Sequence, residues 1–181
     1  MPDDRIWLTG FMATGKSRVA RALAAALDWA AVDIDTMVTE RAGEPVRAIF
    51  ARGGEAAFRA LEAEAVQQAA ALERVVIATG GGTVLAEANR ARMRQRGFVV
   101  CLDARPETIA ARIAQSGEHI SERPLLAGGD PLARIRELKA QRQPLYDEAD
   151  LVIETDELTP DEVTHRIVQA YRERAAAKAA Q

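Results

Sequence analysis

The sequence predicts an α/β protein with a five-stranded parallel sheet that is flanked by helices. Five short apolar runs recur along the chain, and a stretch with apolar residues at helical spacing follows each of them. Strands that alternate with helices in this way are typical of βαβ units, whose strands run parallel with helices covering both faces. The apolar runs lie at 6–8, 31–33, 75–78, 98–102 and 151–153.

The helical stretches are expected at 17–27, 36–72, 87–96, 106–115, 131–148 and 160–176. In the first of them, Val19, Leu23 and Leu27 are four residues apart and therefore fall on one helix face. The connection 34–73 is too long for a single crossover and predicts several helices. The connection 116–130 combines Gly, Ser, Pro and charged residues, which favours a mobile loop or lid.

Length and charge limit the kind of protein. With 181 residues, the chain predicts a single domain over 1–181. The formal net charge is −3 and the sequence pI is near 5.5, which argues against a general nucleic-acid binder. Any anion site must therefore be built from local arginines rather than from the field of the whole protein.

The sequence also predicts a cytoplasmic protein with no membrane partner. The chain starts without a basic segment followed by an apolar one, and no apolar stretch is long enough to span a bilayer. The single Cys101 lies in a predicted buried strand, where a small core residue is favoured over a reactive thiol. With only His119 and His165 besides, a Cys/His metal cluster is excluded.

The segment GFMATGKS at 10–17 fits the phosphate-binding loop G-x-x-x-x-G-K-[ST], between a predicted strand and a predicted helix. Such a loop turns its backbone N–H groups toward the phosphates, and the following helix adds the positive end of its dipole. Lys16 would supply charge to the β- and γ-phosphates, and the Ser17 hydroxyl can bind Mg²⁺. The alternative is a glycine-rich start of a helix. A chance match to all the fixed positions is rare in a chain of this size, and the placement between a strand and a helix makes it rarer.

A GTPase would need a base-reading N-K-x-D or T-K-x-D run, and the sequence contains none. The γ-phosphate is therefore expected to go to an acceptor molecule, which needs a binding site of its own. Asp33 and Asp35 end the second strand and would lie on one side if the chain there were extended. One carboxylate could then bind an acceptor hydroxyl, and the other could hold the water shell of Mg²⁺. A cap on a helix that starts near Thr36 is an equally good reading of either residue alone.

Further candidates lie in the second half of the chain and in the long connection. Arg59 and Glu62 are three apart on one helix face, where they can pair, although a plain surface pair is the simpler reading. The triplet 80–82 follows the third strand, where glycines let the backbone approach a ligand or simply form a turn. Arg123 lies in the expected lid, and Arg142 precedes the fifth strand.

Together these features resemble the shikimate kinase family. The resemblance covers nearly the whole chain, from GFMATGKS through DID, IFARGGEAAFRALE, VVIATGGGTV and RPLL to RQPLYDEAD. The phosphate-binding loop is shared by many families. The ordered combination of Asp-x-Asp, G-E-x-x-F-R, the glycine triplet and R-P-L-L is much more specific.

The resemblance implies a nucleoside-monophosphate-kinase-like fold with a P-loop at 10–17, a helical substrate-binding insertion at about 34–62 and a lid at about 112–128. It implies transfer of the γ-phosphate of ATP to the 3-hydroxyl of shikimate, a step toward chorismate and the aromatic amino acids. Mg²⁺ is the implied cofactor, ATP and shikimate are the implied small-molecule partners, and the family usually works as a monomer.

Carried over by resemblance, the site residues fall into four groups. Lys16, Asp35 and Arg123 would be catalytic, with Arg123 reaching the phosphates from the lid. Ser17, and Asp33 through water, would hold the metal. The acceptor would contact Asp35, Arg59, Gly80, Gly81, Gly82 and Arg142, with Glu62 orienting Arg59 and both arginines on the carboxylate. The nucleotide would contact Ala13, Thr14, Gly15, Lys16, Ser17, Arg18, Arg112 and Arg123, with Arg112 near the adenine.

Three features depart from the family pattern. Ala13 stands where the family usually has glycine and adds a Cβ to a tight loop, at a position that need not have a positive φ. The interval from Arg112 to Arg123 is longer than usual. The segment ETDELTP after the fifth strand offers no adenine-side arginine.

Two other classes of function stay open at this point. One is another small-molecule kinase of the same architecture, acting on gluconate or a nucleotide, although a nucleotide acceptor would not need a two-arginine carboxylate site. The other is a non-catalytic nucleotide-binding regulator. This reading is opposed by the retained Lys16, Ser17, Asp35, Arg59, Arg123 and Arg142.

Overall fold

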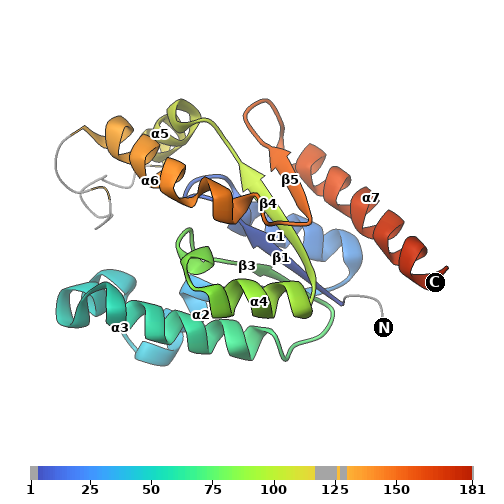
Figure 1. Cartoon of the computed structure of the whole chain (residues 1–181), viewed down its shortest axis with the longest axis horizontal. Coiled ribbons are helices and arrows are strands. Elements are labelled where there is room, and N and C mark those ends of the chain that lie inside the picture. The colour runs from blue at the N-terminus through green and yellow to red at the C-terminus, as the bar shows by residue number, and fades with distance from the viewer. Residues whose placement is uncertain (1–3, 117–125, 127–129, 181) are drawn as a thin grey trace.

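The computed structural model describes residues 4–116, 126 and 130–180 and contains the predicted five-stranded parallel sheet (Figure 1). All strand pairs are parallel, and the strand order is β2-β3-β1-β4-β5. The strands are β1 (Arg5–Thr9), β2 (Ala30–Asp33), β3 (Val75–Ala78), β4 (Phe98–Asp103) and β5 (Leu151–Glu154). The predicted fold class is confirmed, and each predicted apolar run falls within one strand.

Helices cover both faces of this sheet. Alternation along β1 sorts the core, because Ile6 and Leu8 pack in one buried cluster and Trp7 packs in the other. The first cluster includes residues of α1 (Lys16–Leu27) and α7 (Pro160–Ala179). The second includes residues of α2 (Ile34–Ala42), α3 (Val46–Ala69), α4 (Glu87–Gln95), α5 (Pro106–Gln115) and α6 (Pro131–Tyr146). Cys101 is fully buried in the second cluster, as predicted.

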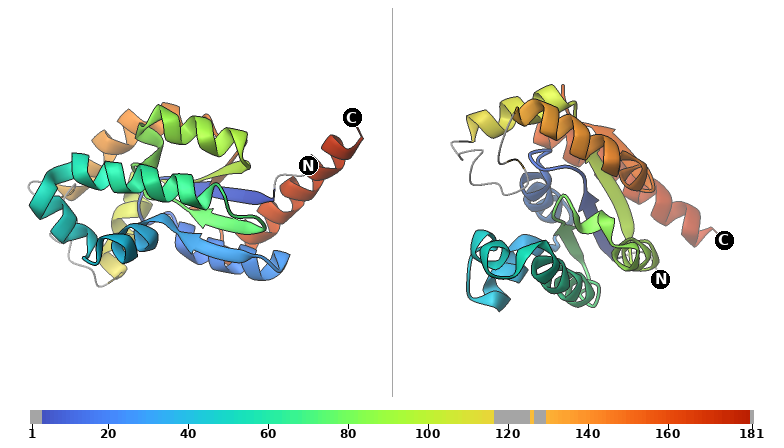
Figure 2. Two further views of the ribbon diagram at one scale, coloured as in Figure 1. Left: turned by 90° about the horizontal axis from the view of Figure 1, so that it is seen from below. Right: turned by 60° about the vertical axis from the view of Figure 1, so that its left-hand side comes forward.

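The long connection after β2 forms two helices. The first of them begins two residues earlier than the spacing predicts. Helix α2 starts at Ile34 rather than near Thr36, because the Asp33 side chain accepts the backbone N–H groups of Asp35 and Thr36. Helix α3 packs beside α2 and bends at Gly54, where φ is 68°. Figure 2 shows this pair of helices extending beyond one end of the sheet.

The strand order decides where the ligand-binding segments meet. The P-loop follows β1, Asp33 ends β2 with Asp35 just after it, and the glycine triplet follows β3. Because β2, β3 and β1 are neighbours and parallel, the segments after all three emerge at the same edge of the sheet. Ligands of open α/β sheets bind at this edge.

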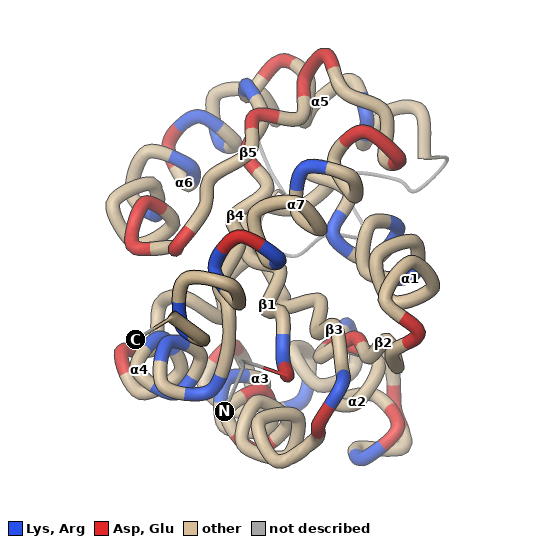
Figure 3. Tube along the Cα trace, turned by 90° about the vertical axis from the view of Figure 1, so that its right-hand side faces the viewer, with Lys and Arg blue, Asp and Glu red and all other residues tan. Residues whose placement is uncertain are grey.

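Charged residues of both signs are distributed along the chain. Figure 3 shows basic and acidic positions interspersed on the helices that are visible from one side of the molecule. Among the described helices, none combines the length and the apolar composition needed to cross a membrane.

Candidate active site

The P-loop wraps closely around the start of α1. Gly10 has a φ of 128°, and a Cβ at this position would lie 2.1 Å from the carbonyl oxygen of Leu102 in β4. A side chain therefore cannot be accommodated here without moving the sheet. The loop places the first turn of α1 behind it, so that free backbone N–H groups and the positive end of the helix dipole are available to an anion.

Lys16 lies over the loop from which it comes. Its ammonium group donates hydrogen bonds to the backbone carbonyls of Gly10 and Phe11, at 2.8 and 2.7 Å. The side chain is almost fully buried. These two acceptors hold the ammonium group at the loop, where it can stabilise phosphate oxygens.

Ser17 and Asp33 meet beside the P-loop. The Ser17 hydroxyl donates to Asp33 Oδ2 at 2.6 Å, and Asp33 Oδ1 caps helix α2. Asp33 therefore has the capping role that the sequence left open. Hydroxyl and carboxylate oxygens are hard ligands of the kind that Mg²⁺ prefers, and this ion keeps several waters and phosphate oxygens as further ligands. The two side chains thus fit a water-mediated Mg²⁺ site.

The described residues contain no larger metal site. No three or more His, Cys, Asp or Glu side chains come together there in a group that could hold an ion. A site made by two protein oxygens and a bound nucleotide is compatible with this finding, because Mg²⁺ in kinases is rarely held in an all-protein cage.

Asp35 lies in the first turn of α2, so the expectation of an extended Asp-x-Asp segment is wrong. Its carboxylate still faces the glycine triplet, since a Cβ on Gly80 would lie 3.0 Å from Asp35 Oδ1. Burial of the carboxyl raises the pKa of Asp35 to about 6, and the charges of Asp33 and Glu62 contribute to the rise. Lys16 and Arg59 act in the opposite direction.

Arg59 is held by two carboxylates on its own helix. It donates to Glu62 Oε2 at 2.8 Å and to Glu55 Oε1 at 3.0 Å, so the predicted pairing with Glu62 is confirmed. Glu62 is fully buried and also accepts the Thr83 hydroxyl at 2.6 Å. The glycine-triplet segment and α3 are thereby joined through one buried carboxylate.

Arg142 comes from α6 and is almost fully buried. Its guanidinium donates to the carbonyl of Gly81 at 3.3 Å and lies over the Phe11 ring, 5.6 Å from the ring centre. The Tyr146 hydroxyl donates to the same Gly81 carbonyl at 2.5 Å. Arg142 therefore touches both the P-loop residue Phe11 and the glycine triplet.

The glycine triplet is required by close approach on three sides. A Cβ on Gly80 would lie 2.9 Å from Glu62 Oε1, one on Gly81 would lie 3.2 Å from the Met12 nitrogen, and one on Gly82 would lie 2.1 Å from the Arg59 guanidinium. Side chains at these positions would push apart Asp35, Arg59 and the P-loop. The triplet is therefore more than a turn, because it lets Asp35, the P-loop and Arg59 approach its backbone closely.

A pocket adjoins the P-loop at the start of α1. It has a volume of about 270 Å³, and its walls include Thr14, Gly15, Arg18, Arg112 and Thr155. Arg112 donates to the backbone carbonyl of Thr155 at 2.7 Å, to the Thr155 hydroxyl at 3.0 Å and to the Ala13 carbonyl at 3.4 Å. The predicted nucleotide residues that the structure describes thus border one another.

Ala13 differs from the expectation made for it. Its φ is 58°, although the sequence interpretation held that a positive φ was not needed. The Cβ is therefore in the left-handed region, which glycine adopts without steric penalty and alanine does not.

Some predictions fall outside the described residues, and some site residues were not predicted. Arg123 and most of the expected lid lie in 117–125 and 127–129, outside the described residues. The sequence analysis did not single out Thr83, Tyr146 or Thr155. Tyr146 could have been suspected because it stands one helical turn after Arg142. The two threonines carry no comparable signal.

Comparison with known proteins assigns the family. The model of the shikimate kinase family matches residues 12–172. Shikimate kinase of Symbiobacterium thermophilum is 47% identical over 93% of this chain and 97% of the relative, and that of Caldanaerobacter subterraneus is 43% identical over 92% and 95%. A structure of shikimate kinase from Acinetobacter baumannii in complex with shikimate has a TM-score of 0.88 at 32% identity and covers 94% of both chains. The chain belongs to the shikimate kinase family.

Proposed function

We propose that this ATP-dependent kinase transfers the γ-phosphate of ATP to the 3-hydroxyl of shikimate and forms shikimate 3-phosphate. One observation carries the choice of acceptor. Arg59 and Arg142 come from distant parts of the chain and both border the Gly81–Gly82 peptide beside Asp35. A small acceptor that carries a carboxylate and hydroxyl groups is complementary to such a set.

The two arginines would bind the carboxylate of the acceptor. The planar guanidinium can donate two parallel hydrogen bonds to a carboxylate, which a lysine ammonium cannot do. Arg142 is pre-positioned by burial and by the Gly81 carbonyl. Arg59 has the exposed Glu55 as one partner, and the acceptor can replace that carboxylate while the buried Glu62 stays in place.

Asp35 would bind the acceptor hydroxyl and receive its proton. As the oxygen of the 3-hydroxyl forms its bond to the γ-phosphorus, the bond from that phosphorus to the β–γ bridging oxygen breaks, and the hydroxyl proton leaves toward Asp35. A carboxylate with a pKa near 6 is ionised at neutral pH and more basic than an ordinary aspartate.

The P-loop and Lys16 would hold the phosphates in line with that oxygen. Phosphoryl transfer needs alignment and charge stabilisation more than covalent help from the protein. Lys16 and the N–H groups of the loop stabilise the negative charge that moves to the bridging oxygen. Ser17, and Asp33 through water, would hold Mg²⁺, which when bound neutralises charge on the phosphate oxygens.

The other assignments remain predictions. Gly80 and Gly82 would add close backbone contact with the acceptor, and Thr14, Gly15, Arg18 and Arg112 would border the nucleotide. Arg123 is expected to reach the phosphates from the lid. The protein is expected to act in the cytoplasm as a monomer, in a single domain with the insertion at about 34–62.

The function is tested by offering several acceptors to the purified chain with MgATP. We expect phosphorylation of shikimate, and no comparable turnover of gluconate or nucleoside monophosphates. The carboxamide of shikimate lacks the anion, so its kcat/KM should be about 10²–10⁴-fold lower. This preference should shrink in Arg59→Ala and in Arg142→Ala. Equal use of the acid and the carboxamide would contradict the carboxylate clamp and the choice of substrate.

A further inference from the structure

Tyr146 holds the carbonyl at the centre of the proposed acceptor site. Its hydroxyl donates to Gly81 O at 2.5 Å, whereas Arg142 reaches the same oxygen at 3.3 Å. The phenol is therefore the stronger of the two donors. Its side chain is almost fully buried, so water cannot replace the bond without rearrangement.

The phenol remains a donor throughout the usual assay range. Burial raises the pKa of Tyr146 well above its usual value, and the adjacent Arg142 charge offsets only part of that rise. The hydroxyl is therefore protonated at neutral and mildly alkaline pH.

Fixing this carbonyl fixes a whole peptide unit. The peptide bond between Gly81 and Gly82 is planar and trans, so the N–H of Gly82 points away from the oxygen that Tyr146 holds. The α-carbon of Gly82 faces the Arg59 guanidinium. Two glycines would otherwise leave this unit free to rotate between the two arginines. Tyr146 thus sets the orientation of a flexible segment.

The Tyr146 hydroxyl also affects the position of Arg142, because both side chains donate to the carbonyl of Gly81. Arg142 makes one long hydrogen bond to Gly81 O and a further hydrogen bond to the Tyr146 side chain, so the phenol holds the guanidinium as well as the carbonyl. Without the hydroxyl, a partly buried carbonyl would have Arg142 as its remaining side-chain donor, and the guanidinium would be drawn toward it and away from the acceptor.

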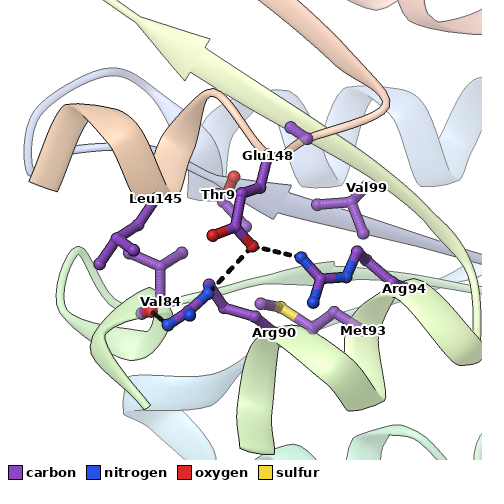
Figure 4. Close-up of a pocket in the computed structure, with 9 residues that line it drawn as sticks. Thr9, Val84, Arg90, Met93, Arg94, Val99, Leu145 and Glu148 are labelled. Carbon is purple, nitrogen blue, oxygen red and sulfur yellow. Dashed lines mark hydrogen bonds and ion pairs between the residues drawn. The ribbon is translucent and has the colours of Figure 1, made fainter. Parts of the chain in front are cut away.

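A second set of contacts, here called the outer tie, joins the segment after the glycine triplet to the end of α6 through Arg90 (Figure 4). Arg90 of α4 donates to the Val84 carbonyl at 2.7 Å and to Glu148 Oε2 at 3.1 Å. Val84 lies in the short 3₁₀ helix η1 (Thr83–Leu85) that follows the glycine triplet, and Glu148 follows the end of α6. Arg94 binds the same Glu148 oxygen and is much more exposed than Arg90.

We propose that Tyr146 is a positioning residue for the acceptor, which orients the Gly81–Gly82 peptide and Arg142 and is itself kept in register by Arg90 and Glu148. This inference rests on the proposed function and assigns a specific task within it. Tyr146 does not take part in the chemical step, and it does not contact the nucleotide loop through its hydroxyl.

The main test is Tyr146→Phe, which removes one oxygen and keeps the ring. We expect the calorimetric Kd and the KM for shikimate to rise roughly tenfold, as loss of one well-placed buried hydrogen bond predicts. The Kd for ATP and kcat at saturating shikimate should stay within about threefold, because the P-loop and Asp35 are unchanged. The preference for shikimate over its carboxamide should shrink as well.

The chain offers a matched control, because it contains just two tyrosines. Tyr171 lies on α7, against the opposite face of the sheet, and packs edge-on against Trp29. Tyr171→Phe should leave the affinity for both substrates unchanged. If Tyr146→Phe weakens shikimate and ATP equally, or leaves shikimate binding within about twofold of wild type, the inference is wrong although the proposed function stands.

A second pair of variants keeps the test decisive if Tyr146→Phe does not fold. Arg90→Gln removes both contacts of the outer tie, and Arg94→Gln removes only a contact to Glu148. We expect a several-fold rise in the KM for shikimate in the first variant and no change in the second. A loss of thermal stability in Arg90→Gln without a change in that KM would show a purely structural tie and contradict the inference. A wild-type chain that neither binds nor phosphorylates shikimate would contradict the proposed function and this inference with it.

Discussion

The nucleotide side and the acceptor side of the proposed site are built in different ways. Most of the nucleotide side comes from one continuous segment, 10–18, which folds on itself and presents backbone groups. The acceptor side is assembled from α2, α3, the glycine triplet and α6, and it presents charged side chains. The first depends on local geometry, and the second depends on the order of the strands in the sheet.

The two sides also handle charge differently. Lys16 donates hydrogen bonds to the neutral carbonyls of Gly10 and Phe11, and the phosphates of a nucleotide would add negative charge beside it. Arg59 is already paired with Glu55 and Glu62, and Asp35 adds a further carboxylate. The acceptor side is thus closer to charge balance before any ligand binds. Variants on the two sides should therefore fail in different ways.

Asp35→Asn should have the largest effect and should spare the nucleotide side. The amide keeps the size of the side chain but cannot take up the hydroxyl proton, so kcat should fall about 10²–10⁴-fold. The Kd for ATP should be nearly unchanged, as titration calorimetry can check. Asp28→Asn, at the exposed C-terminal cap of α1, is the control and should keep wild-type kcat. If ATP affinity collapses while turnover at saturation survives, Asp35 serves the metal or the loop instead.

Lys16→Met tests the nucleotide side and should have the next largest effect. Charge develops on the β–γ bridging oxygen as the bond breaks, so Lys16 contributes more in the transition state than in the ground state. Loss of at least ~3 kcal/mol of stabilisation should lower kcat about 10²-fold. Lys178→Met near the end of α7 is the control. A folded Lys16→Met enzyme with near-normal kcat would remove Lys16 from the mechanism.

The same contrast explains what the sequence could predict. The P-loop could be predicted because its glycines, Lys16 and Ser17 lie within eight consecutive positions. The parallel sheet could be predicted because each strand is an apolar run followed by a helical stretch. The candidate acceptor residues Arg59 and Arg142 were found through family resemblance. Spacing alone could not have brought together residues from α3 and α6, since that contact depends on how the helices pack.

Other features of the site depend on single hydrogen bonds and backbone angles, which no sequence motif specifies. Because Asp33 caps α2, the strand ends at Asp33 and Asp35 lies in the first turn of the helix. The expectation of an extended Asp-x-Asp segment was wrong for this reason. The left-handed backbone at Ala13 depends on how the loop closes, and an alanine in the sequence argues against it. Tyr146 and Thr83 act through single hydrogen bonds to buried partners, whose positions are fixed only by the tertiary fold.

The pH dependence of kcat/KM for shikimate tests the role of Asp35 on the acceptor side. The pKa of Asp35 in the free enzyme is about 6, and the carboxylate is the active form. The kcat/KM for shikimate should therefore be flat above that pH and fall with a limiting slope of about tenfold per pH unit below it. Asp35→Asn should lose this bend along with most of its activity. A wild-type profile that stays flat down to pH 5 would contradict the role of Asp35 as the ionised base.

The same raised pKa has a consequence for folding. The folded state binds the Asp35 proton more tightly than the unfolded chain does, so its contribution to stability falls as pH rises from about 4 to 6. Although neighbouring groups surround its carboxyl, Asp35 as a whole residue keeps much of its surface open to solvent, so screening should keep this effect to about 1 kcal/mol or less. Asp35→Asn should accordingly be slightly more stable than wild type at pH 7, as urea unfolding can check.

Ala13→Gly should give the smallest effect and tests whether the P-loop stores strain. An L-residue in the left-handed region is less favourable by roughly 1–2 kcal/mol, and the added freedom of glycine in the unfolded chain offsets about half of that gain. We expect the variant to be about 0.5–1 kcal/mol more stable, with kcat close to wild type. Ala25→Gly is the matched control, because Ala25 is exposed within α1, where glycine should destabilise by about 0.5–1 kcal/mol. Opposite signs in urea unfolding would support the strained loop, whereas similar destabilisation in both variants would mean that Ala13 is unstrained in solution.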